Sequence, residues 1–288
     1  MRSLPSALVL LLPATGCIIY TGDGFDADAG PPSHCGSGSG GPGGDQGGGF
    51  GGADTARYTG VAVEILEPDA GLDLDGDGDV DNNLPIAIDA LSQALGGDRS
   101  WDPGAELQRL VEDGAWVPLM QVRDVEDGLV VGLLAGTRAE DGGLAVLPGS
   151  YDDAGRIVSV LHGERSRSGG FEAGPGPVRL PARLAGDVDI VLPLDGAMVV
   201  GRTSEDGAAT MVAGVVPTEL LIESALAPYL GADGLDIDGD GVADLSTEAV
   251  LDTVAELLDD PAVTDFMDDE GGRGISAAFW IDWEAADF

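Results

Sequence analysis

Several residue types that build common active sites are scarce or missing in this chain. Lysine is absent, so all 13 basic residues are arginine, and the 288 residues include only two histidines and two cysteines. These counts leave no Cys/His zinc spacing, and without lysine there is no phosphate-binding loop of the Gly-Lys-Ser/Thr type. Beyond the N-terminus, no apolar run approaches the roughly 20 residues that span a bilayer.

Positive charge is scarce as a whole. The chain has 52 acidic residues against its 13 arginines, a formal net charge of −39. Residues 57–288 hold 47 of the acids and 12 of the arginines, which leaves −35 on the part expected to fold. Such a field repels nucleic acid and anionic lipid surfaces and attracts cations, so we expect no nucleic-acid partner. A solvated, salt-tolerant surface explains the same excess and remains an alternative.

No catalytic constellation stands out. His34 lies in a Gly-rich segment, which leaves His162 as the one histidine of the foldable part, and no G-x-S-x-G elbow is present. Among so many acids, two carboxylates at the roughly 5–10 Å separation of a glycosidase arise by chance. The four tryptophans are more often core residues than sugar platforms. We therefore expect a non-enzyme, with a secreted polysaccharide-acting hydrolase that uses a carboxylate pair as the alternative.

The first residues have the layout of a secretory signal. Arg2 supplies positive charge, Leu4–Leu12 is a short apolar run, and the small residues of Ala14–Gly16 precede Cys17. This ending resembles the lipobox of bacterial lipoproteins, although Ala14 stands where that family usually has Leu. The resemblance implies cleavage before Cys17 and lipidation of that cysteine, and hence a lipid anchor in the cell envelope, at the outer membrane or the cell surface.

An ordinary signal cleavage at the same small residues is the alternative. The product would then be secreted or periplasmic, with Cys17 and Cys35 available for a disulfide. In both cases residues 17–56 are expected to be a flexible tether. In Gly36–Gly52, 11 of the 17 residues are glycine, and such a segment buries too little surface to offset its ordering entropy. A tether of this kind holds its ends about 30–35 Å apart.

Two acidic segments, 163 residues apart, repeat one pattern. Gly71–Asp81 has the sequence GLDLDGDGDVD and Gly234–Asp244 has GLDIDGDGVAD, so both contain D-x-D-G-D-G-x-x-D. Acids at alternate positions converge on one cation as the backbone curls, and a central glycine permits the sharp turn. An acidic turn without metal is the alternative, but carboxylates this dense repel one another when no cation neutralises them.

Over about ten residues per copy, the pattern resembles the loops of EF-hand, dockerin and thrombospondin-type calcium repeats. The resemblance implies Ca²⁺ as the ligand, held by side chains at positions 1, 3, 5 and 9 and by the carbonyl at position 7. The expected ligands are Asp73, Asp75, Asp77, Asp79 and Asp81 in the first copy, and Asp236, Asp238, Asp240, Val242 and Asp244 in the second. Position 12, a bidentate Glu in EF-hands, is Leu84 or Thr247 here, which predicts weak sites of about 10⁻⁴–10⁻³ M.

Hydrophobic periodicity predicts an α+β fold. Residues 58–67 alternate as in a strand and residues 84–95 have one apolar helical face. Short apolar runs broken by turn signals over residues 115–216 are typical of an antiparallel sandwich or barrel. Residues 217–260 are expected to form an EF-hand-like helix–loop–helix segment, and residues 278–283 a closing strand. We therefore expect an antiparallel β-sandwich or barrel core with helices flanking two acidic calcium-type loops.

Together, these features divide the chain into a signal peptide (1–16), a tether (17–56) and one globular domain (57–288). The expected function is that of a non-catalytic, calcium-binding surface lipoprotein with a structural, adhesion or partner-binding role. Its contact with the membrane is expected to run only through the lipid on Cys17. An envelope protein or a polysaccharide is the class of partner that fits this position.

Overall fold

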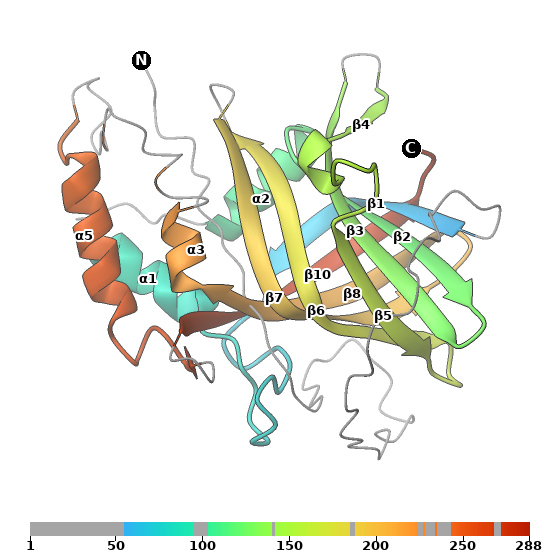
Figure 1. The fold of residues 1–288 in the computed structure, drawn as a ribbon, viewed down its shortest axis with the longest axis horizontal. Helices are drawn as coiled ribbons and strands as arrows, with labels where there is room; N and C mark the ends of the chain where they lie inside the picture. Colours follow the sequence, from blue (N-terminus) through green and yellow to red (C-terminus); the bar gives the residue numbers. More distant parts are fainter. Residues whose placement is uncertain are drawn as a thin grey trace.

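Strands rich in Val, Leu, Ala and Gly are the main secondary structure of the described chain and close into an antiparallel barrel (Figure 1). The computed structural model describes residues 55–94, 103–139, 142–184, 188–223, 227, 234, 243–267 and 272–288. The barrel strands are β1 (Thr55–Ile65), β2 (Val117–Val125), β3 (Gly128–Arg138), β5 (Ser159–Arg165), β6 (Gly170–Leu184), β7 (Val188–Thr203), β8 (Gly207–Pro217) and β10 (Arg273–Ala285). Each strand pairs with the next, and β10 also pairs with β1, so the sheet closes on itself.

The interior of the barrel is apolar. Along β10, every second residue from Ile275 to Trp283 belongs to the main core, as the alternation of a strand requires. The indole nitrogen of Trp283 donates to Thr210 Oγ1 (2.9 Å), and that of Trp116 donates to the carbonyl oxygen of Pro181 (3.2 Å). Both tryptophans are buried and satisfied within the domain, so neither offers a face on which a sugar could stack.

Two insertions interrupt the succession of barrel strands, and both emerge at the end of the barrel where β1 and β8 finish. Between β1 and β2 lie the first acidic loop, α1 (Leu84–Ala94) and α2 (Pro103–Glu112); between β8 and β10 lie α3 (Thr218–Leu221), α5 (Thr247–Leu258) and β9 (Phe266–Met267). Two short elements, β4 (Leu144–Val146) and η1 (Pro148–Ser150), lie beside β3. Helix α1 contacts α5, so segments far apart in sequence lie side by side (Figure 1).

Of the two expected core architectures, the chain forms the barrel and not the sandwich. Local periodicity marks strands but not closure, which depends on the pairing of β1 with β10 across more than 200 residues. Strand β1 also begins earlier than expected, because Thr55 and Ala56, assigned above to the tether, pair with Arg123 and Val122. Within the described residues no helix is long and apolar enough to cross a membrane.

Two of the sequence predictions fall on parts of the chain outside the described residues. These are the N-terminal signal and lipidation site with Cys17 and Cys35, and most of the second acidic loop. In the segment expected to form a helix–loop–helix, the described helical parts include α3 at its start and α5 at its end. The first acidic loop is described in full, and the site below is built on it.

Candidate cation site

The first acidic loop is anchored to the outside of the barrel by its leucines. Leu72 and Leu74 are 2% and 0% exposed, and they alternate in sequence with Asp73 and Asp75. They pack in one cluster with residues on the outer faces of three barrel strands, namely Met198, Met211, Ala213 and Ala278. Burying two leucines contributes about 3–6 kcal/mol, which fixes the backbone that carries the aspartates.

Backbone hydrogen bonds bring the two ends of the loop together. Leu72 and Asp81 form an antiparallel bridge in which the Asp81 amide donates to the Leu72 carbonyl oxygen (2.9 Å). The Leu74 amide in turn donates to Asp81 Oδ2 (2.6 Å). As a result the ninth position of the motif, Asp81, lies beside the first and third positions, as a loop that wraps around one ion requires.

Asp73 is the central acid of this loop. Its side chain is almost fully buried, and its two oxygens accept hydrogen bonds from the amides of Gly76 (2.7 Å) and Gly78 (3.1 Å). Gly78 has φ of +101°, a backbone conformation that side-chain-bearing residues rarely adopt. The glycine thus allows the turn that aims an amide at Asp73, and this explains why the motif has Gly at that position.

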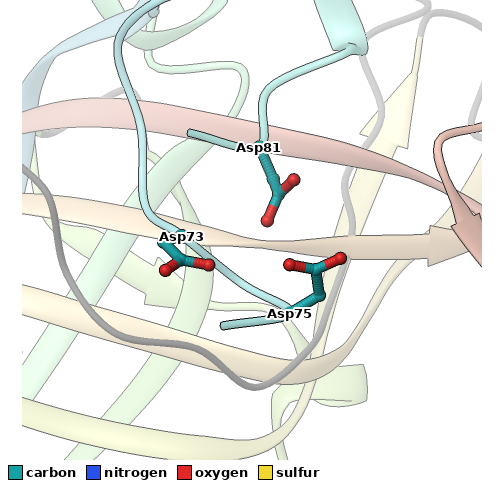
Figure 2. Close-up of side chains that lie close together, drawn as sticks. All are labelled: Asp73, Asp75 and Asp81. Atoms are coloured by element: carbon teal, nitrogen blue, oxygen red, sulfur yellow. The ribbon is translucent and has the colours of Figure 1, made fainter. Parts of the chain in front are cut away.

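Three carboxylates converge on one point. Asp73, Asp75 and Asp81 each offer an oxygen, and these oxygens all lie within 4.8 Å of one another (Figure 2). Asp73 is buried, Asp81 half-buried and Asp75 exposed, so the group opens to solvent on one side. Carboxylate oxygens at this spacing suit a hard divalent cation that takes six to eight oxygen ligands. A cluster of this kind could hold a metal ion.

One of the predicted side-chain ligands does not join the group. Asp77 is exposed at the tip of the loop, and its Oδ1 accepts a hydrogen bond from the Asp79 amide (2.8 Å). Asp75 Oδ1 likewise accepts from the Asp77 amide (3.0 Å). The Asp77 carboxylate is not part of the converging group, although the spacing of the motif predicts it there. Asp79, expected to bind through its backbone carbonyl, keeps that role as a prediction.

The electrostatics of the group follow from its burial and its crowding. Partial burial, with a smaller contribution from repulsion by Asp75 and Asp265, raises the pKa of Asp81 from 3.8 to about 6 against the opposing hydrogen bond from the Leu74 amide. The carboxylates are therefore held together at an electrostatic cost. A bound cation would offset that cost by stabilising the ionised carboxylates.

Two residues around the loop could not have been found from the repeat. The buried side chain of Asn82 donates to the carbonyl oxygens of Leu66, Glu67 and Ala70 and accepts from the Ala278 amide (3.1 Å), so it fixes the base of the loop to β10. Asp265 comes from the segment after α5, more than 180 residues away in sequence. Burial of its carboxylate, together with repulsion from Asp75, raises its pKa.

Position 12 of the motif has a structural explanation. Leu84, which stands where an EF-hand has its bidentate Glu, is the first residue of α1 and lies in the main core with 3% of its surface exposed. A carboxylate there would be buried against the end of the barrel. The first loop therefore lacks this ligand because the position helps to pack α1.

The second repeat is described only at its edges. Asp236, Asp238, Asp240 and Val242 lie outside the described residues, and Asp244 is exposed. At the base of the repeat, a Cβ on Gly234 would lie only 2.3 Å from the carbonyl oxygen of Leu245, so the two residues that bound the loop are in close contact. Helix α5 begins at Thr247, the position equivalent to Leu84, and Ser246 Oγ caps it by accepting from the Ala249 amide (3.2 Å).

His162, the one histidine of the folded part, is exposed on β5, as a surface strand residue would be.

The chain matches no protein-family model, no curated protein and no solved structure in the comparisons. The case for a function therefore rests on the chemistry of the acidic loop.

Proposed function

We propose that the protein is a non-catalytic, calcium-binding lipoprotein of the bacterial cell envelope. The observation that carries the calcium part is the convergence of Asp73, Asp75 and Asp81 within 4.8 Å, on a loop whose backbone is held by its own amides and leucines. Such a loop needs little rearrangement to receive an ion, so little binding energy is lost in ordering it.

Calcium is favoured over other cations by the type and number of ligands. All three side chains offer oxygen, without the nitrogen or sulfur that transition metals prefer, and the exposed side of the group leaves room for water and backbone oxygens. Magnesium demands a smaller, near-octahedral shell and is less suited to an open loop. With Leu84 at position 12, the affinity should be that of extracellular calcium modules, about 10⁻⁴–10⁻³ M.

A second calcium is proposed for the second repeat. Its expected ligands are Asp236, Asp238, Asp240, the Val242 carbonyl and Asp244, by equivalence with the first copy. Two described features support the equivalence. The base of the loop is closed by Gly234 against Leu245, and α5 begins where α1 begins in the first copy.

The membrane part of the proposal comes from the N-terminal residues. Lipidation of Cys17 would place the barrel beyond a Gly-rich tether, in a compartment where calcium is plentiful, with an envelope protein or polysaccharide as partner. Detergent-phase partitioning of the wild type against a Cys17→Ser variant tests this. The lipoprotein proposal predicts that only the wild type enters the detergent phase. A wild type confined to the aqueous phase would contradict this proposal.

Thermal melting tests the calcium part. At 5 mM Ca²⁺ and a Kd of about 0.1–1 mM, one site stabilises the fold by about 1–2.3 kcal/mol, or a few degrees in Tm for a domain of this size. Melting is compared in EDTA, in Ca²⁺ and in Mg²⁺, for the wild type, for Asp73→Asn and for a control, Asp127→Asn. Asp127 lies in the exposed β2–β3 turn, away from the loop. We expect Asp73→Asn to lose much of the calcium shift and the control to keep it; equal melting of the wild type with and without Ca²⁺ would contradict the proposal.

A further inference from the structure

The acidic loop and the segment after α5 share one edge of β10. Pairing of β1 with β10 ends at Ile65 and Phe279, so the earlier residues of β10 find other partners on that side. Ala278 is the first of these, since its carbonyl oxygen accepts from the Leu66 amide (3.0 Å) and its amide donates to Asn82 Oδ1 (3.1 Å). The loop thus continues along β10 from the point where β1 stops.

The segment after α5 continues along the same edge. The Ser276 amide donates to Asp265 Oδ1 (2.8 Å), and the Ser276 hydroxyl donates to Asp265 Oδ2. Beyond it, β9 pairs Phe266 with Gly274. Two segments that belong to the two different insertions are therefore consecutive neighbours on one strand, and they meet at Ser276.

Direct contacts join the two segments at that meeting point. The Asn83 amide donates to Ser276 Oγ (2.9 Å), and the Asn83 side chain donates to the carbonyl oxygen of Val263 (3.1 Å). Phe266 packs against the cluster that contains Leu72 and Leu74, which is the apolar underside of the acidic loop. Polar and apolar contacts alike fasten the segment after α5 to the loop.

Charge repulsion between acids of the two segments works against this junction. The Asp265 carboxylate is hydrogen-bonded to Ser276, whose hydroxyl also accepts from the amide of Asn83, two residues after Asp81. Burial is the main cause that raises the pKa of both Asp265 and Asp81, and repulsion from Asp75 adds to it. In the ionised state without a cation, the carboxylates push the loop and the segment apart. The nearby Arg273 donates to the Asp259 carbonyl oxygen (2.7 Å) and to Asp259 Oδ1 (2.9 Å). Its charge therefore stabilises the end of α5 and is paired with Asp259 rather than with Asp265.

We propose that a cation in the first loop controls how firmly the segment Asp259–Met267, and with it the end of α5, is held against β10. The inference rests on the proposed calcium site. Neutralising Asp75 and Asp81 removes their repulsion of Asp265, so the hydrogen bonds to Ser276 and the packing of Phe266 hold the segment unopposed. Calcium in the first repeat thereby stabilises the helix that follows the second repeat.

Hydrogen exchange on the full chain, read by mass spectrometry, tests this coupling at pH 7.5. Saturating Ca²⁺ is expected to slow exchange of the amides in residues 260–267 by about 3–10-fold relative to EDTA, the effect of relieving a partly exposed charge repulsion. Exchange in residues 129–135 of β3, which lie outside this junction, should not change. Calcium binding is measured on the same sample by calorimetry.

Asp265→Asn supplies the matched variant, because it loses the charge while its oxygen still accepts from the Ser276 amide and its NH2 group can donate to the Ser276 hydroxyl oxygen. In this variant residues 260–267 should exchange slowly with and without Ca²⁺, while calcium affinity stays within about threefold of wild type. Two results would contradict the coupling without contradicting the calcium site. The first is a wild type that binds calcium but shows unchanged exchange in residues 260–267. The second is an Asp265→Asn variant whose exchange responds to calcium as fully as that of the wild type. Absence of calcium binding in the wild type would remove both proposals.

Discussion

Replacing Asp81 with Asn should stabilise the protein when no cation is present. Asp81 is half-buried, and its pKa is raised from 3.8 to about 6 by burial and by repulsion from Asp75 and Asp265. Discounted for solvent screening, a shift of this size makes ionised Asp81 unfavourable by about 1–2 kcal/mol at neutral pH. Asparagine removes the charge and keeps an oxygen to accept from the Leu74 amide.

The pH dependence has a definite sign. A carboxyl group whose pKa is raised in the folded state binds its proton more tightly there than in the unfolded chain. Its contribution to stability is therefore fully present below pH 3.8 and is lost as the pH rises through about 6. The Asn variant lacks this titration, so the difference between variant and wild type should be largest above pH 6 and vanish near pH 4.

Urea denaturation in EDTA at pH 7.5 and at pH 4.5 measures that difference. We expect Asp81→Asn to be about 1–2 kcal/mol more stable than wild type at pH 7.5, with most of that gap gone at pH 4.5, and a Tm higher by about 2–6 °C at the higher pH. In millimolar Ca²⁺ at pH 7.5 the gap should narrow or reverse, because only the wild type keeps all three carboxylates. An Asn variant that is less stable than wild type in EDTA at pH 7.5 would refute the reasoning.

Three further substitutions test how the loop is held. Leu74→Ala removes a fully buried side chain between the loop and the barrel and should lower the free energy of unfolding by about 2–5 kcal/mol in urea titrations. Gly78→Ala, at a φ of +101° with open space around the Cβ, should cost about 1–2 kcal/mol from backbone strain alone, and a cost near zero in the same titration would contradict that conformation. Asn82→Ala leaves the Ala278 amide and several loop carbonyls without their partner and should cost about 1–3 kcal/mol and accelerate amide exchange in residues 66–72.

Individual helices and strands could be predicted from the sequence, because each depends on the spacing of apolar residues within one short segment. The alternation of residues 58–67 gave a strand, and the apolar face beginning at Leu84 gave α1. The barrel and the sandwich could not be told apart, because both use the same short alternating strands and differ in whether the first and last strands pair. That pairing, β1 with β10, joins residues at opposite ends of the folded chain.

The candidate site, too, could be predicted only where its residues lie close together in the sequence. The D-x-D-G-D-G-x-x-D spacing predicted that Asp73, Asp75 and Asp81 converge, since their positions are fixed by one tight loop. It placed Asp77 among them as well, but the Asp77 carboxylate is not in the converging group, and its Oδ1 accepts from the Asp79 amide. Asp265 and Ser276 could not be foreseen, because they reach the loop through the tertiary fold of β10.

Calcium stoichiometry tests the central claim most directly. Isothermal titration of the full chain with Ca²⁺, carried to several millimolar, should give two sites of about 10⁻⁴–10⁻³ M. Asp73→Asn should leave one, Asp73→Asn combined with Asp236→Asn should leave none, and Asp127→Asn should keep both. A wild type that takes up no calcium at these concentrations, or an Asp73→Asn variant that binds as the wild type does, would contradict the account.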